Sequence, residues 1–232
     1  MTRTEFLTAN TNAHATRLTR WLLACGVVGP LLFIVVFLIE GATRAGYSVW
    51  NDYVSELALG DQGWEQIANF IQCGLLIMAF ALGLKRLWPT GKASVWGPLL
   101  IGGFGLSLVV AGVFVTDPHG APQTWHGTVH GVNALPAFFL PTAACFVLAR
   151  RFASTPEDQG WACCSVITGV LVLSLFVISL ASGVISEHGG TMSLPTGLFQ
   201  RASIILGWGW LAMVALYLMR KEIQETMAVS RG

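Results

Sequence analysis

Charged side chains are scarce in this sequence. Asp, Glu, Lys and Arg together make up 11% of the 232 residues, whereas hydrophobic residues make up 54%. A soluble domain usually carries about 25% charged residues, so the composition excludes an ordinary water-soluble domain and indicates that lipid surrounds most of the chain. The net charge of +1 gives no general attraction for nucleic acid, and we expect no nucleic-acid partner.

Cysteine is missing from the predicted loops, where a disulfide framework would need it. The five cysteines all lie in apolar runs: Cys25, Cys73, Cys145, Cys163 and Cys164. Secreted disulfide-rich domains place their cysteines in loops. We therefore interpret these thiols as small apolar residues of helices.

Long apolar runs, by contrast, are frequent. A transmembrane helix needs about 20 predominantly apolar residues. Six windows meet that requirement: 21–39, 66–84, 95–115, 128–149, 161–185 and 198–219. Because backbone N–H and C=O groups in lipid must pair locally, each window is predicted to be an α-helix. The expected fold is all-α, a single six-helix transmembrane domain over 21–219 with terminal tails at 1–20 and 220–232.

The distribution of Lys and Arg predicts the orientation. Of the 13 Lys and Arg residues, all but Arg44 and Arg201 fall in the two tails or in the loops after the second and fourth spans. Cytoplasmic loops carry the excess of Lys and Arg in membrane proteins. We therefore expect both termini in the cytoplasm and the loops after the first, third and fifth spans outside.

The first outer loop, residues 40–63, is the longest. Its apolar residues recur at three- and four-residue spacing: Tyr47, Trp50, Val54 and Leu57. This pattern predicts a short amphipathic helix over 48–60 that lies in the outer interface or folds over the bundle as a lid. Asp52 and Glu56 would contact a ligand if the lid folds inward, and would otherwise form a solvated face.

Polar side chains within the spans gather near the outer ends. The main ones are Gln66, Asn69, Gln72, His126, His130, Asn133, Ser179, Ser182, Ser186, Gln200 and Arg201. Polar groups in lipid turn toward the bundle interior or a wet cavity. The pattern predicts an outward-facing polar pocket closed below by apolar side chains. Alternatively, these residues are helix ends that an interface tolerates.

Some of these polar residues are candidates for binding a ligand. They are Asn69, Gln72, Asn133 and Arg201. Arg201 is the one basic group at the expected depth, and a guanidinium suits a phosphate or carboxylate headgroup.

A histidine pair at the start of the fourth span suggests metal chemistry. His126 and His130 are four residues apart, a spacing that brings two imidazoles to one side of a helix. Further ligands would come from His119, His188 or Asp117. A zinc ion there would activate a water molecule, with Glu187 or Asp117 as the catalytic carboxylate. The alternative is a hydrogen-bonded network that stabilises the loops.

The segment from Tyr47 to Gly60, which includes Ser55-Glu56-Leu57, together with Asn69, Asp117 and His130, resembles the bacterial and archaeal membrane family catalogued as domain of unknown function 998. The resemblance implies one six-span domain in the cytoplasmic membrane of a prokaryote, with no established activity. A looser likeness to the alkaline ceramidase and adiponectin-receptor superfamily, membrane hydrolases with a zinc site, concerns the chemistry only, because those proteins have seven spans.

Three functions remain open from the sequence. The first is a metal-assisted hydrolase or lipid-modifying enzyme that acts on an outer-leaflet amphiphile. The second is a non-enzymatic membrane protein that binds a lipid or small molecule, as a sensor or accessory subunit. The third is a haem protein with His130 and His188 as axial ligands.

Overall fold

The computed structural model describes the backbone of residues 3–118, 121–187 and 195–229, and the side chains of residues 16–118, 121–186 and 195–228. Its elements are α1 (Arg3–Thr43), η1 (Val54–Ala58), α2 (Gly63–Leu87), α3 (Ala93–Val113), α4 (Trp125–Phe152), η2 (Pro156–Asp158), α5 (Gln159–Glu187) and α6 (Thr196–Val229). All six α-helices are long and apolar enough to cross a membrane, and no strand occurs in the described residues. The six-span, all-α prediction is confirmed.

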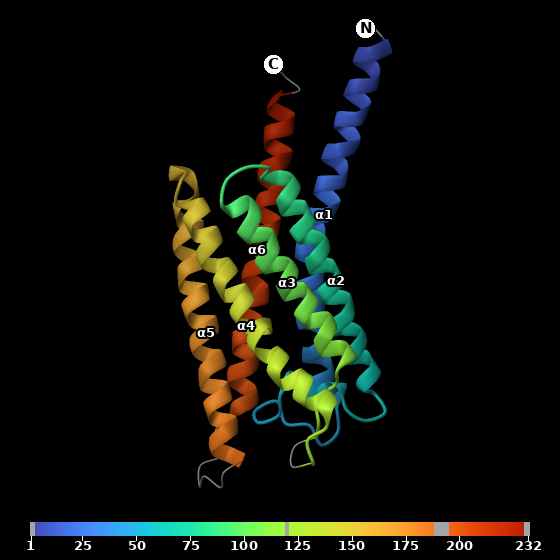
Figure 1. Ribbon diagram of the computed structural model, residues 1–232, viewed down its shortest axis with the longest axis vertical. Helices are drawn as coiled ribbons and strands as arrows, with labels where there is room; N and C mark the ends of the chain where they lie inside the picture. The colour runs from blue at the N-terminus through green and yellow to red at the C-terminus, as the bar shows by residue number, and fades with distance from the viewer. Residues whose placement is uncertain (1–2, 119–120, 188–194, 230–232) are drawn as a thin grey trace.

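The helices form a closed ring in which each packs against the next along the chain and α6 packs against α1. Short connections between antiparallel neighbours favour this order. Both termini lie at one end of the bundle, at the top of Figure 1, which we call the terminal end. The loops after α1 and α3 lie at the opposite end, together with the last residues of α5, and we call it the distal end.

Apolar side chains fill the ring and also cover its outer face. Inside, Trp208 packs edge-on against Phe104 with ring centroids 4.6 Å apart, and Phe138 stacks on Phe176 at 4.2 Å. Outside, Val132 is 63% exposed, and many other Leu, Ile and Val side chains are also largely exposed. Apolar surface of this extent is unfavourable in water and suits contact with lipid.

Glycines bring α2 and α3 close together. A Cβ on Gly74 would lie 2.5 Å from the carbonyl oxygen of Gly105, and a Cβ on Gly105 would lie 2.7 Å from that of Gly74. Small residues allow this backbone approach between membrane helices.

Only part of the helix predicted over residues 48–60 is present. The structure has turns followed by the five-residue 3₁₀ helix η1. Val54 and Leu57, on η1, are buried against the bundle, whereas Trp50 is exposed. The loop therefore lies over the distal end of the ring, although without the continuous amphipathic helix.

Backbone carbonyls in this segment bond to donors from α6, which accounts for the missing helical turns. The Arg201 guanidinium donates to the carbonyl oxygen of Val49 at 2.6 Å, and the Leu198 N–H donates to that of Trp50 at 3.0 Å. In an α-helix those carbonyls would accept from N–H groups four residues later. Tertiary contacts that the sequence pattern does not reveal have replaced the local ones.

Candidate functional site

A small cavity, which we call the distal pocket, lies inside the ring beneath the first loop. Its walls come from α1, η1, α2, α3, α4 and α6, and its volume is about 50 Å³. Most of the lining is apolar, with the rings of Phe33, Phe70, Phe138 and Trp208 among it. The polar lining residues that the structure describes are Ser55, His130, Asn133 and Gln200, and of the described lining only the His130 imidazole is acidic or basic. The pocket therefore suits a small neutral group.

Backbone groups of neighbouring elements orient three of these polar side chains. His130 Nδ1 lies 2.7 Å from the carbonyl oxygen of Phe114, so Nδ1 carries the proton, because a carbonyl can only accept. Asn133 donates to the carbonyl oxygen of Ser107 at 2.8 Å, and Gln200 accepts from the Val54 N–H at 2.7 Å. The polar side of the pocket is thus held in place before any ligand arrives.

Trp208, one of the residues that line this pocket, carries an unused hydrogen-bond donor. The side chain is 2% exposed, and its indole N–H has no acceptor among the described residues. A buried donor without an acceptor costs about 1–3 kcal/mol. A ligand oxygen in the distal pocket would remove that cost.

The loop above the pocket is tied down by Arg201, which is 6% exposed. Besides the Val49 carbonyl, its guanidinium donates to the carbonyl oxygen of Asp52 at 2.9 Å and to the Tyr47 hydroxyl. Burial raises the pKa of the Tyr47 phenol, which favours its neutral form. Arg201, predicted to bind a headgroup, is in this structure committed to the loop and forms no ion pair with a described carboxylate.

The other predicted ligand-binding residues lie in different places. Asn69 is buried and donates to the carbonyl oxygen of Phe33 at 3.1 Å, which joins α2 to α1, whereas Gln72 is exposed on α2. Of the amides predicted to bind a ligand, Asn133 alone lines the distal pocket.

The carboxylates of the first loop stabilise its turns. Asp52 accepts from the Ser48 N–H and Glu56 accepts from the Tyr53 N–H, both at 2.7 Å. Asp52 and Glu56 also border a wide basin on the distal surface, separate from the distal pocket.

The predicted zinc ligands are only partly described. His126 is exposed beside Trp125, with ring centroids 3.6 Å apart, whereas His130 lines the distal pocket. Within the part of the chain that the structure describes, no three His, Cys, Asp or Glu side chains are close enough to hold a metal ion. His119, His188 and the side chain of Glu187 lie outside the described residues. The zinc site and the haem pairing therefore stay predictions.

Asp117 has a structural partner at the start of α4. Its carboxylate accepts from the Thr124 N–H at 2.8 Å and from the Thr124 hydroxyl at 2.7 Å, and the Thr124 hydroxyl accepts from the Gly127 N–H. The backbone hydrogen bond from Thr124, followed by the one from its hydroxyl, lowers the pKa of Asp117. The residue predicted to be catalytic thus supports the N-cap of α4.

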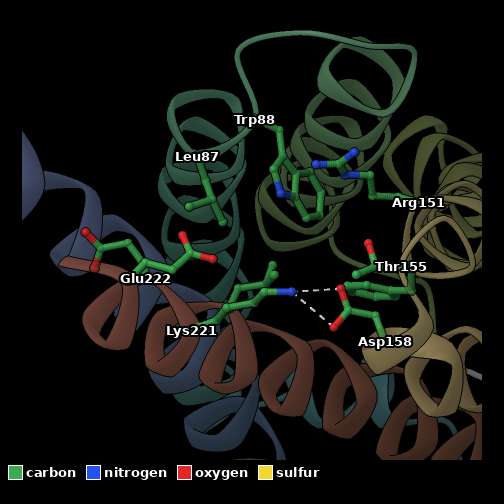
Figure 2. A pocket seen from close by; sticks show the side chains of 10 residues that line it. Leu87, Trp88, Arg151, Thr155, Asp158, Lys221 and Glu222 are labelled. Carbon is green, nitrogen blue, oxygen red and sulfur yellow. Dashed lines mark hydrogen bonds and ion pairs between the residues drawn. The ribbon is translucent and has the colours of Figure 1, made fainter. Parts of the chain in front are cut away.

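A second cavity, which we call the terminal pocket, opens at the other end of the ring (Figure 2). Its volume is about 220 Å³, and residues from the ends of α2, α4 and α6 and from η2 line it. The Lys221 ammonium lies 2.9 Å from the Asp158 carboxylate on one wall. No sequence pattern predicted this pocket, because its charged residues fall in segments that resemble ordinary cytoplasmic loops and tails.

The fold and its cavities define a class: a six-span α-helical membrane protein whose ring of helices holds a pocket at each end. The chain belongs to the family described as protein of unknown function (DUF998), whose profile matches residues 27–217. The match includes every residue that lines the distal pocket and confirms the resemblance seen in the sequence. No curated protein and no solved structure is significantly similar to the chain.

Proposed function

We propose that this protein is a non-enzymatic binding protein of the membrane, a sensor or accessory subunit. It takes the neutral polar end of an amphiphile into the distal pocket. The observation that carries the proposal concerns Trp208, which lines this mostly apolar cavity and whose buried indole N–H lacks an acceptor among the described residues. Ligand pockets typically combine apolar walls with a few polar groups that fix orientation.

The lining supports a neutral ligand group. Among the described residues, no Asp, Glu, Lys or Arg lines the distal pocket, and Arg201 nearby donates to two carbonyls and a phenol of the first loop. An uncompensated ionic headgroup would lose its hydration on entry without gaining a counter-charge. A hydroxyl or carbonyl would instead accept from Trp208 and exchange hydrogen bonds with the neutral side chains.

The volume supports a small group. A cavity of about 50 Å³ exceeds the roughly 30 Å³ that one water molecule occupies in the liquid. The polar end of an alcohol, monoacylglycerol or similar amphiphile fits that space, and the remainder of the molecule would stay among the helices and lipid. If the termini are cytoplasmic, as the Lys and Arg distribution predicts, the amphiphile comes from the outer leaflet.

The proposal is tested by extracting what co-purifies with the full chain in mild detergent. We expect a neutral amphiphile at a fixed ratio, recovered from the wild type and lost from Ala137→Phe, which fills the pocket from α4. Val132→Phe, on the exposed face of the same helix, should retain it. Equal recovery from both variants, or no neutral amphiphile in the wild type, would contradict the proposal.

A further inference from the structure

The terminal pocket carries its own charges and lies at the end of the ring that the distal pocket does not reach. Its walls include Trp88 from the end of α2, Arg151 from the end of α4, and Lys221 with Glu225 from α6. Figure 2 shows Arg151 and Glu222 on opposite sides of the opening, with Lys221 and Asp158 below. Groups of both signs therefore surround a single cavity.

Most of these charges already have partners. Lys221 donates to both oxygens of Asp158, at 3.1 and 2.9 Å, and the Tyr217 hydroxyl also donates to Asp158. Glu222 pairs with Arg20 of α1 at 2.6 Å. The paired charges therefore cancel on the side of the pocket toward η2, and they also cancel on the side toward α1.

Two charges of the lining form no ion pair within 4.0 Å among the described residues, namely Arg151 and Glu225, and Arg151 attracts Asp158 only at longer range. The Arg151 guanidinium lies 5.6 Å from the ring centroid of Trp88, a cation–π contact that leaves its N–H groups available. The pocket therefore offers one guanidinium and one carboxylate to a ligand that carries one charge of each sign.

The pocket also lies at the level expected for lipid headgroups. The rings of Trp88, Phe152, Trp161 and Tyr217 contact one another around it, and aromatic side chains of this kind gather at membrane interfaces. Leu87 and Leu218 add apolar lining. Its volume of about 220 Å³ is below the roughly 300–1,000 Å³ of common small-molecule pockets, so a headgroup fits while acyl chains stay in the bilayer.

We propose that the terminal pocket binds a phosphate–ammonium zwitterion, carried as the phosphoethanolamine headgroup of a phospholipid in the leaflet at that end. The Arg151 guanidinium binds the phosphate, for which its planar donor geometry is well matched. The Glu225 carboxylate accepts from the primary ammonium. A choline headgroup has no N–H to donate, and a glycerol headgroup has no positive charge.

The test uses the full chain in nanodiscs or detergent, with lipid binding measured by native mass spectrometry. We expect phosphatidylethanolamine to bind more tightly than phosphatidylcholine or phosphatidylglycerol. Arg151→Gln and Glu225→Gln should each weaken that binding about tenfold, the order expected for loss of one charge-assisted hydrogen-bonding partner. Matched controls are Arg150→Gln and Glu157→Gln, which remove the same charges at exposed positions outside the pocket.

Each alternative outcome is distinct. Equal losses in the control variants, or a preference for phosphatidylglycerol, would overturn the proposal in favour of general surface attraction. Soluble phosphoethanolamine that binds as tightly as the lipid would support the zwitterion site and overturn the lipid as its source. If the preference for phosphatidylethanolamine is lost in Arg151→Gln but kept in Glu225→Gln, the role of Glu225 would be overturned.

Discussion

The guanidinium of Arg201 on α6 donates to the hydroxyl of Tyr47 in the first loop, across a sequence separation of 154 residues. The same guanidinium also bonds to two backbone carbonyls of that loop. One side chain of the last helix therefore holds the segment that covers the distal pocket. Arg201 is thus a structural tie in this structure, and the headgroup binding that the sequence suggests stays a prediction.

Replacement of Arg201 should loosen the loop. Arg201→Gln removes donors from the carbonyls of Val49 and Asp52, and hydrogen bonds to charged groups contribute about 1.5–3 kcal/mol each. We expect faster proteolysis within residues 44–62 and a lower thermal midpoint. Arg201→Lys distinguishes hydrogen bonding by the guanidinium from an effect of its positive charge alone, because an ammonium keeps the charge but lacks the planar arrangement of N–H donors. Full rescue by lysine would contradict the tie and favour a role of charge alone.

Trp208→Phe should weaken ligand binding, and it should destabilise the ligand-free protein only through the smaller volume of the phenyl ring. A smaller aromatic ring replaces the indole, and the lost N–H has no acceptor among the described residues. Loss of one hydrogen bond to the ligand, about 0.5–1.5 kcal/mol, predicts an affinity that is lower by roughly twofold to tenfold. Unfolding in detergent and ligand titration measure the two effects.

Trp210→Phe is the matched control for that variant. Its indole N–H donates to the Ser165 hydroxyl at 3.0 Å, and its side chain is also buried. We expect the opposite result: ligand affinity is unchanged, and stability falls further, by about 0.5–1.5 kcal/mol, from the lost hydrogen bond to Ser165, whose hydroxyl still donates to the Trp161 carbonyl oxygen. The same response in both variants would refute the assignment of Trp208 as the free donor.

Gly105→Val should disrupt the contact between α2 and α3. Its side chain would overlap the Gly74 carbonyl and the Met78 backbone, so the helices must separate. Overpacking of this kind costs about 1–3 kcal/mol or more. Gly131→Val has no neighbouring atoms within 4 Å of its new Cβ and serves as the control on a membrane helix. Similar thermal midpoints for the two variants would contradict close packing at Gly105.

The start of α4 should depend on pH through Asp117. Because hydrogen bonds from Thr124 lower the pKa of Asp117 in the folded state, this carboxylate contributes stability above its unfolded pKa of about 3.9. That contribution is lost as the pH falls through the lower folded pKa. We expect the Gly127 and Thr128 amides to lose hydrogen-exchange protection selectively below about pH 4. In Asp117→Asn, the extra loss at acid pH should be absent.

Zinc content discriminates the binding protein from the metal-assisted enzyme. For the binding protein, we expect no stoichiometric zinc after purification without chelators, and unchanged metal content in His126→Ala and His130→Ala. One zinc per chain, lost in both variants, would instead favour the enzyme, with further ligands from the regions around His119 and His188.

The six spans follow from the sequence, because lipid penalises polar groups strongly enough to restrict them by depth, whereas the outward-facing polar pocket stays a prediction and the distal pocket is mostly apolar. His130 and Asn133 were identified from that pattern and do line the pocket. Trp208 was missed, because a Trp within an apolar helix is typical of a core residue. That its N–H lacks an acceptor among the described residues becomes apparent only when all neighbouring atoms are placed in three dimensions. The hydrogen-bond acceptors of Arg201 were missed, because every residue has a backbone carbonyl and the sequence does not show which of them lie near this side chain.

The terminal pocket was missed for a related reason. Asp158 and Lys221 are 63 residues apart and meet only once α6 has closed the ring on η2. Ion pairs between distant loops and tails have no periodicity to detect, whereas the amphipathic and apolar patterns of single helices do.

Photolabelling of the distal pocket tests most directly whether it takes up a neutral amphiphile. A monoacylglycerol with a diazirine near its glycerol end is added to the full chain in nanodiscs, illuminated, and mapped by peptide mass spectrometry. We predict labels concentrated in residues 130–138 and 200–208, the α4 and α6 walls of the pocket, and their loss in Ala137→Phe but not in Val132→Phe. Labels spread over the lipid-exposed helix faces, unchanged by Ala137→Phe, would contradict binding in the pocket.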